Sequence, residues 1–161
     1  MAVQSEDDEA AAINTAVRLL AMRHRARAAS LLATIGLNIG QEVLLFELAV
    51  RDGRTQAQLA TAASCEAPTV TMAVRKLEAA GLISRVRSEH DNRAVLVSLT
   101  DAGHELMPRL RAIWRQLAIE TEGALPRADR KRLVHLLQAA TASLDSAPQV
   151  DVLASPIATA P

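Results

Sequence analysis

The sequence predicts a mainly α-helical protein that also contains a small amount of β structure, an α+β fold. Half of its 161 residues are apolar, dominated by alanine and leucine, which favour helix. Apolar residues recur at helical spacing towards both ends, whereas clean alternation is found in a short stretch at residues 95–99. We therefore expect long terminal helices to flank a middle segment, 38–100, whose two short helices and β-ribbon are ordered as in a winged helix-turn-helix.

The first long helix is expected over residues 13–37. Helical spacing places one set of its residues on a common face: Ile13, Val17, Leu20, His24, Leu31 and Ile35. The preceding residues 1–12 include the acidic run Glu6–Glu9 and are expected to form a flexible tail. Because a secretory signal begins with a basic segment, this acidic start favours a cytoplasmic location.

The middle segment is expected to begin with a helix capped by Asn38 and Gln41, whose inward residues would be Val43, Leu44 and Leu48. A second capping pair, Thr55 and Gln58, predicts the start of the next helix. Residues 64–66 interrupt the helical pattern and are expected to form a turn. Pro68 then suits the first turn of a further helix, where its missing N–H is not needed.

This further helix, over about residues 67–80, is the predicted recognition helix. Its inward face would consist of Val70, Ala73, Val74 and Leu77. Its outward face would carry hydroxyls, a thioether and cations: Thr69, Thr71, Met72, Arg75 and Lys76. Such side chains can contact DNA phosphates and base edges in a major groove. An ordinary solvated face is the alternative, and the ribbon that follows argues against it.

Gly81 is expected to end the recognition helix, and two strands should follow at residues 82–86 and 95–99. The loop between them begins at Arg87 and carries Asp91 and Arg93 at its tip. A planar cation such as Arg93 gains from the negative potential of a minor groove, and Arg87 is a further candidate for DNA contact. Asp91 is expected to hold Arg93 in place, because DNA phosphates would repel a carboxylate. Thr100 would cap the next helix.

Residues 101–145 predict two more helices, separated by a break near Gly123 and Pro126, with a kink or a late start possible at Pro108. Their apolar residues recur at helical spacing: Leu106, Leu110, Ile113, Leu117, Leu133, Leu136, Leu137, Ala140 and Leu144. Together with residues 13–37, this is more apolar helix than the small middle segment 38–100, which we call the reading head, can bury. A dimer built from the terminal helices is therefore expected, and a monomer with its own bundle is the alternative. Residues 146–161 are rich in Ala, Pro and Ser and are expected to be flexible.

Two motifs resemble the multiple-antibiotic-resistance regulator (MarR) family of bacterial winged-helix transcription factors. The first is L-E-A-A-G-L-I at 77–83, and the second is D-N-R-A-V-L-V-S-L-T-D-A-G at 91–103. The family pattern D-x-R-x-x-x-V-x-L-T-x-x-G is matched by Asp91, Arg93, Val97, Leu99, Thr100 and Gly103. The resemblance covers about residues 13–145. Met72 departs from it, since similar members often carry a more polar or basic residue there, which leaves the operator sequence open.

The resemblance implies a homodimer, and its two-fold symmetry predicts a palindromic operator on double-stranded DNA. We expect a repressor, although the residues equally allow an activator of genes. The resemblance also implies that a small anionic or aromatic effector binds between the dimer helices and the reading head. Arg23, His24 and Arg27 are candidate residues for such a ligand. For His24 a satisfied core or interface histidine is the alternative, and the scarcity of aromatic residues weakens a stacking pocket.

Charge and cysteine content agree with a cytoplasmic DNA-binding protein. Residues 13–145 contain all 18 basic residues and 13 of the 18 acidic ones, although the whole chain is neutral.

We find no phosphate loop, no metal-ligand spacing and no pairing of a nucleophile with a base, so no cofactor, metal or catalytic residues are expected. No apolar run is long enough to cross a membrane. The single cysteine, Cys65, is interpreted as a structural thiol in preference to a redox sensor.

Two other function classes remain open at this point. A winged helix can serve as a protein-interaction module without specific DNA binding, in which case reversing the charge of Arg75 and Arg93 would leave function intact. An enzyme would need an active site that the motifs do not reveal.

Overall fold

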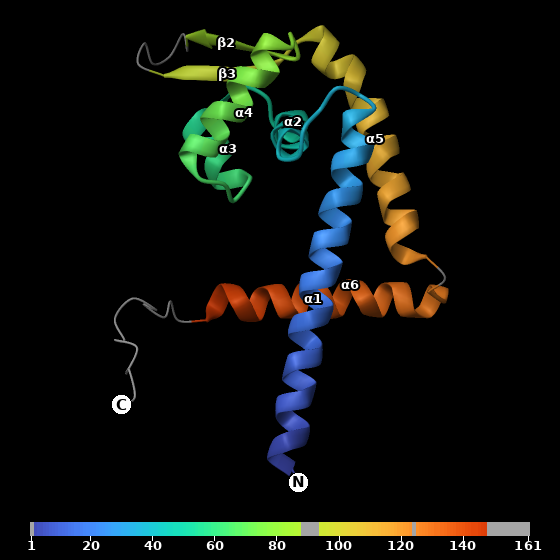
Figure 1. The fold of residues 1–161 in the computed structure, drawn as a ribbon. Helices are drawn as coiled ribbons and strands as arrows, with labels where there is room; N and C mark the ends of the chain where they lie inside the picture. The colour runs from blue at the N-terminus through green and yellow to red at the C-terminus, as the bar shows by residue number, and fades with distance from the viewer. Residues whose placement is uncertain (1, 88–93, 124, 148–161) are drawn as a thin grey trace, which may run out of the picture. The chain divides into compact units, whose positions relative to one another are not determined.

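A computed structural model of the protein describes residues 2–87, 94–123 and 125–147, with side chains from residue 7 onward. The elements are α1 (Ala2–Ala33), α2 (Gln41–Val50), β1 (Arg54–Thr55), α3 (Gln56–Ala62), α4 (Ala67–Ala79), β2 (Ile83–Arg87), β3 (Val95–Leu99), α5 (Asp101–Glu122) and α6 (Arg127–Ser146) (Figure 1). They divide into two compact units, one up to Thr121 and the other from Glu122 onward. The expected α+β winged-helix fold is confirmed.

The small sheet is antiparallel, with the strand order β1-β3-β2. In the predicted ribbon, Ile83 pairs with Leu99 and Arg87 pairs with Val95, so the two strands match along their full length. The two-residue strand β1 adds to the other edge of β3, where Arg54 faces Val97. Strand β1 was not predicted, because two residues are too few to show an alternating pattern.

The main core lies where α2, α3, α4, the sheet and parts of α1 and α5 meet. Its fully buried side chains include five leucines from five different elements: Leu32, Leu45, Leu59, Leu77 and Leu110. Burial of one such side chain stabilises a fold by roughly 1.5–3 kcal/mol. The reading head is therefore one packed body with the adjoining ends of the long helices.

The start of α5 is fixed against the head by Thr100, as predicted. The Thr100 hydroxyl donates to the carbonyl of Gly81 at 2.6 Å and accepts from the N–H of Gly103 at 3.1 Å. Gly103 permits this approach, since a Cβ at that position would lie 2.2 Å from the carbonyl oxygen of Leu82. The helix begins at Asp101, so the possible late start at Pro108 does not occur. Figure 1 shows the axis of α5 changing direction after its first turns.

The C-terminal part of α1 runs beside α5 (Figure 1). Ala28 and Leu31 of α1 pack there against Ile113 and Leu117 of α5. Arg27 adds a two-point contact with Glu120, with N–O distances of 2.6 and 2.7 Å. This pair of helices forms a second, smaller core that extends from the head.

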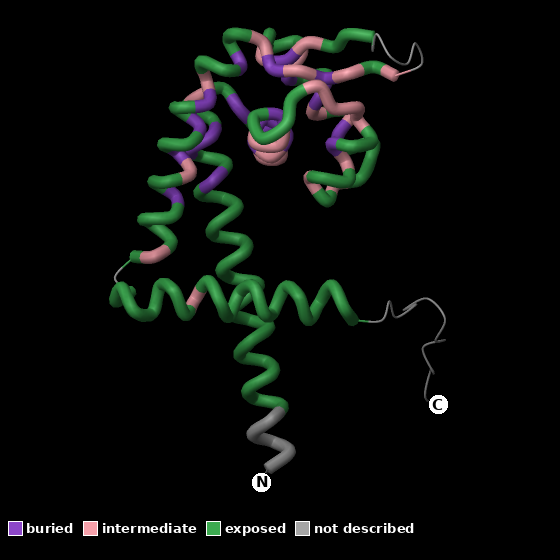
Figure 2. The backbone as a smooth tube through the Cα atoms, turned by 180° about the vertical axis from the view of Figure 1, so that it is seen from behind, coloured by how far each residue is buried: buried purple, intermediate pink, exposed green. Residues whose placement is uncertain are grey.

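The N-terminal part of the chain differs from the expectation of a flexible tail. Helix α1 begins at Ala2 rather than at residue 13. Alanine has the highest helix propensity, and it is frequent in this segment, at residue 2 and at residues 10–12. The expected apolar face of this half is exposed in the protomer, with Ile13 at 57% and Val17 at 55% (Figure 2). Helix α6 likewise has no buried residue.

The cap of α2 also differs in detail from the expectation. Gly40, with φ of 92°, is the residue before the helix, not Asn38. The Gln41 side chain nevertheless accepts from the Asn38 N–H at 2.7 Å, as the reciprocal half of a capping pair would. A positive φ is easily adopted by glycine, and for this reason the chain turns into the helix at Gly40.

Candidate nucleic-acid interface

The helix-turn-helix is built from caps that the sequence predicted. The Thr55 hydroxyl accepts from the Gln58 N–H at 3.2 Å, and the Gln58 side chain accepts from the Thr55 N–H at 3.0 Å. Helix α3 ends at Ala62, and Ser64 takes a left-handed φ of 49° in the turn. Helix α4 then begins with Pro68 in its first turn. These local features orient α4 relative to α3.

Helix α4 presents one face to the core and the opposite face to solvent. Val70, Val74 and Leu77 are buried, as predicted, and Ala73 is half-buried. Thr69, Met72, Arg75 and Lys76 are exposed. The predicted outward face is therefore exposed at four of its five positions.

Thr71 is the fifth position, and it lies partly buried at the contact between α3 and α4. Its hydroxyl is 2.9 Å from the carbonyl oxygen of Ala67 and 3.0 Å from the side-chain oxygen of Gln56. A hydroxyl has one proton to donate. That proton is therefore used inside the head.

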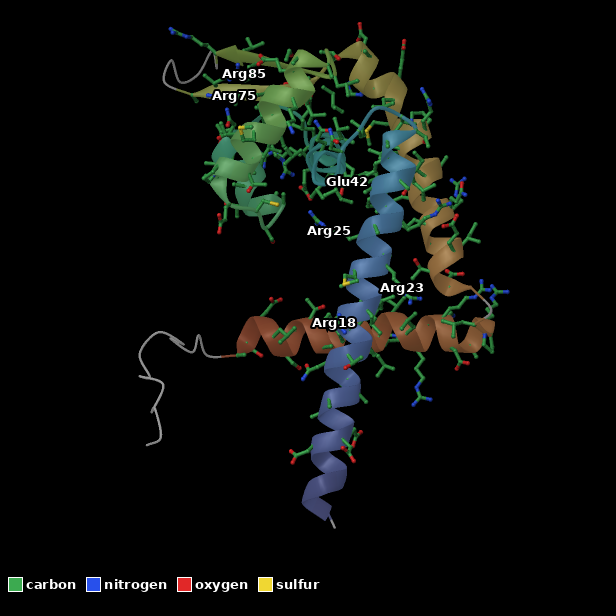
Figure 3. All side chains as sticks on the ribbon, viewed as in Figure 1. Arg18, Arg23, Arg25, Glu42, Arg75 and Arg85 are labelled. Carbon is green, nitrogen blue, oxygen red and sulfur yellow. The ribbon has the colours of Figure 1, made fainter. Side chains whose placement is uncertain are left out.

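The cations around α4 fall into two groups (Figure 3). Arg85 of β2 is paired with Glu78 of α4, through Nε–Oε1 at 2.9 Å and Nη2–Oε2 at 2.6 Å. This contact lowers the pKa of Glu78 and raises that of Arg85. Arg75, Lys76 and Arg87 are exposed and form no ion pair within the described part of the chain. Among these four cations, the three without an ion pair lie on α4 and at the end of β2.

The expected wing-tip residues Asp91 and Arg93 lie outside the described residues. The flanking strands place the ends of their loop at Arg87 and Val95, which pair across the ribbon. The loop thus begins and ends at the same edge of the sheet.

A cavity of about 390 Å³ lies between α4 and the connection from α1 to α2. Its wall is mostly apolar and includes Ile39, Leu44 and Met72, with Lys76 as its one charged residue. Cys65 also lines it, and its Sγ lies 3.2 Å from the carbonyl oxygen of Ala63. Arg23, His24 and Arg27 are not among the residues of this wall.

The three predicted ligand residues are exposed on α1, and the structure does not gather them into one site. Arg27 is occupied by Glu120, whose pKa is lowered to about 2 mainly by the hydrogen bonds from Arg27. His24 is exposed, which excludes a core role within the protomer. Arg25, which lies between His24 and Arg27 in the sequence, extends instead towards α2 (Figure 3).

Glu42 of α2 is a buried carboxyl that was not among the predicted site residues. It is 5% exposed, and its Oε2 has no hydrogen-bond partner within the described residues. Burial raises the pKa of Glu42, opposed by backbone hydrogen bonds at the start of α2 and by the charge of Arg25. The sequence carries no signal for this burial, because helical periodicity alone does not distinguish position 42 from an exposed one.

The described residues contain no cluster of His, Cys, Asp and Glu suited to a metal ion. No described helix is long and apolar enough to cross a membrane.

Comparisons with known proteins place this site in context. The MarR family profile matches residues 37–95, which include α2 to β2 and the start of β3. The uncharacterized HTH-type transcriptional regulator YdgJ of Bacillus subtilis is 29% identical over 105 residues, which are 65% of this chain and 64% of YdgJ. The chain thus matches slightly less than two thirds of the length of that relative.

Two solved structures carry information on binding. One is BpsR of Bordetella bronchiseptica, whose DNA binding is regulated by 6-hydroxynicotinic acid. Its structure has a TM-score of 0.72 and 26% sequence identity, and the match covers 80% of this chain and 93% of BpsR. The transcriptional repressor CouR, bound to a 23-mer DNA duplex, has a TM-score of 0.72 and 25% identity, covering 78% and 89%. Similarity to both extends beyond the reading head to most of the chain.

Proposed function

The chain belongs to the MarR family of DNA-binding transcriptional regulators, and from this premise we propose that it is a homodimeric repressor of a palindromic operator. It acts in the cytoplasm, and a small molecule modulates its binding to DNA. The observation that carries the proposal is the exposed outward face of α4, on which Arg75 and Lys76 are free of ion pairs within the described residues.

On this proposal α4 enters the major groove. Thr69, Met72 and Arg75 contact bases or phosphates, and Lys76 contacts phosphate. Thr71 contributes less directly, because its hydroxyl proton is already donated within the head. Arg87 reaches the DNA backbone from the end of β2, and Arg93 enters the minor groove with Asp91 supporting it.

Exposed apolar side chains on the long helices support a dimer. On α1 they include Val17 and Met22, on α5 Ile119, and on α6 Leu136 and Leu144, with exposed fractions between 55% and 76%. Large apolar side chains left exposed on each of these helices are typical of a surface that is covered by a partner. A two-fold dimer would hold its two copies of α4 about one DNA turn apart, which requires a palindromic operator.

Modulation by a ligand is supported by the cavity beside α4 and by the likeness to BpsR. A small anionic or aromatic molecule is the proposed effector. Arg23 and His24 are exposed on α1 and do not line this cavity, so they are candidates for an effector that binds between the dimer helices and the reading head. Arg27 would first have to leave Glu120. The effector would shift the population between dimers that bind DNA and dimers that do not.

The proposal is tested by titrating the full chain against the DNA upstream of its own gene at several salt concentrations. We expect tight binding to one palindrome, with a steep salt dependence. Arg75→Ala and Arg93→Ala should weaken binding, and each phosphate contact that is lost should reduce the slope of log K against log salt by about 0.9. Arg111→Ala, an exposed arginine on α5, is the matched control and should change neither quantity.

Equal affinity for the palindrome and for random DNA, unchanged by Arg75→Ala, would refute the specific regulator. Sedimentation equilibrium of the same preparation is expected to give a dimer. Val17→Glu, which places a charge on the exposed apolar face of α1, should shift it towards monomer.

A further inference from the structure

Met72 occupies the middle of the outward face of α4. It is 55% exposed and follows Thr69 by three residues, while Arg75 and Lys76 lie three and four residues further along. In a helix these spacings place side chains on the same side. The thioether of Met72 therefore lies between the hydroxyl of Thr69 and the two cations of the outward face of α4.

The side chain of Met72 is unsuited to reading the polar edges of bases. Its sulfur is a weak acceptor and it has no donor, so it cannot pair with the N7 or O6 of guanine or the N7 of adenine. Two neighbours of Met72 on α4 cannot supply a donor in its place. Pro68 has an apolar side chain, and the hydroxyl proton of Thr71 is donated to Ala67 or Gln56.

The major groove offers one apolar group at base edges, the C5-methyl group of thymine. A flexible thioether can pack on such a methyl group without a fixed geometry, because methionine has three rotatable side-chain bonds. We propose that Met72 is a specificity-determining residue that recognises the methyl group of a thymine in each operator half-site. The proposal rests on the proposed function, and it assigns the chemistry of one position in the operator.

The arrangement also places this thymine. It should lie between the bases or phosphates contacted by Thr69 on one side and by Arg75 on the other, since the three side chains follow one another along α4. Burying one methyl group is worth about a three- to five-fold change in affinity. A single thymine per half-site should therefore be detectable by removal of its methyl group alone.

The test uses the full chain and the operator found by the titration above. Each thymine of one half-site is replaced in turn by deoxyuridine, which lacks the methyl group and keeps every hydrogen-bonding atom. We expect one position at which the wild-type protein loses about three- to five-fold in affinity. Met72→Ala should lose affinity for the thymine operator and become insensitive to deoxyuridine at that position, while Met72→Leu should keep the sensitivity.

Thr69→Ser is the matched control, because it removes the neighbouring methyl group and retains the hydroxyl. Its sensitivity at the Met72 position should equal that of the wild type. The proposal is overturned if no deoxyuridine position weakens the wild type, or if Met72→Ala remains as sensitive as the wild type. Either result with tight wild-type binding to the unmodified palindrome would leave the proposed function intact, whereas absence of specific binding would remove both.

Discussion

Glu78 and Arg85 join the end of the recognition helix to the first strand of the ribbon. Their two contacts, Nε–Oε1 at 2.9 Å and Nη2–Oε2 at 2.6 Å, have the planar two-point geometry that arginine forms with a carboxylate. Both side chains are about one third exposed, so the pair lies at the surface of the reading head. One cation of the head is thereby neutralised before DNA is bound.

Glu78→Gln should release the charge of Arg85. We expect binding to random DNA to strengthen, and the slope of log K against log salt to steepen by up to about 0.9 if Arg85 then reaches a phosphate. Arg85→Ala in the wild-type background should change the slope much less than Arg75→Ala does. Fluorescence anisotropy with a random duplex at several salt concentrations measures these slopes.

Glu105→Gln removes an exposed carboxylate of α5 and controls for net charge. If it steepens the salt dependence as much as Glu78→Gln does, the effect comes from net charge and the ion pair has no special role.

Gly103→Ala should strongly destabilise the protein. The added Cβ would lie 2.2 Å from the backbone oxygen of Leu82, which cannot move without disturbing the junction of α4 and the sheet. We expect a loss of roughly 3 kcal/mol in the free energy of unfolding, at the upper end of overpacking effects. Gly36→Ala, where φ is +77° but the space is open, should lose about 1 kcal/mol. Urea denaturation ranks the two, and equal losses would mean that the close approach of Leu82 to Gly103 costs no more than the backbone strain at Gly36.

Glu42 should make stability fall with rising pH. A carboxyl whose folded pKa is raised above its ordinary value of 4.5 binds its proton more tightly in the folded state. Its contribution to the free energy of unfolding is thus most favourable below pH 4.5 and declines as the pH rises through the pKa of the folded state. Glu42→Gln should remove this decline, so its urea midpoint should gain on that of the wild type between pH 4 and pH 8.

Glu120 acts in a different pH window. Its pKa is lowered to about 2, so its contribution is present above pH 4.5 and is lost as the pH falls towards 2. The two carboxyls can therefore be separated by pH. A Glu42→Gln profile parallel to that of the wild type from pH 4 to pH 8 would contradict the assignment to Glu42.

Thr55→Val should lower the free energy of unfolding by about 1 kcal/mol, because it removes the hydroxyl that accepts from the Gln58 N–H. Valine keeps the shape of threonine, so packing is little changed. Thr61→Val removes an exposed hydroxyl that bonds to its own helix at Ala57, and it should have a much smaller effect. Thermal unfolding monitored by circular dichroism compares the two, and the cap would have no measurable role if their effects were the same.

Several local elements could be predicted because their causes lie within a few residues. The capping pair Thr55 and Gln58, the proline start of α4 and the glycine end at Gly81 each follow from contacts within one helical turn. The ribbon from Ile83 to Leu99 follows from alternation and a polar loop. The cap of α2 and the start of α1 were predicted less well, since glycine can replace a capping side chain and alanine-rich segments extend a helix.

The tertiary structure decides which charges and hydroxyls remain available to a ligand. Arg85 is neutralised by Glu78 seven residues away, the Thr71 hydroxyl lies against Gln56 fifteen residues away, and Arg27 is held by Glu120 ninety-three residues away. Periodicity along one helix cannot reveal such partners, because they come from other elements that folding brings together. Local patterns therefore specify the order of helices and strands and the outward face of α4, whereas packing selects the residues of that face that can meet DNA.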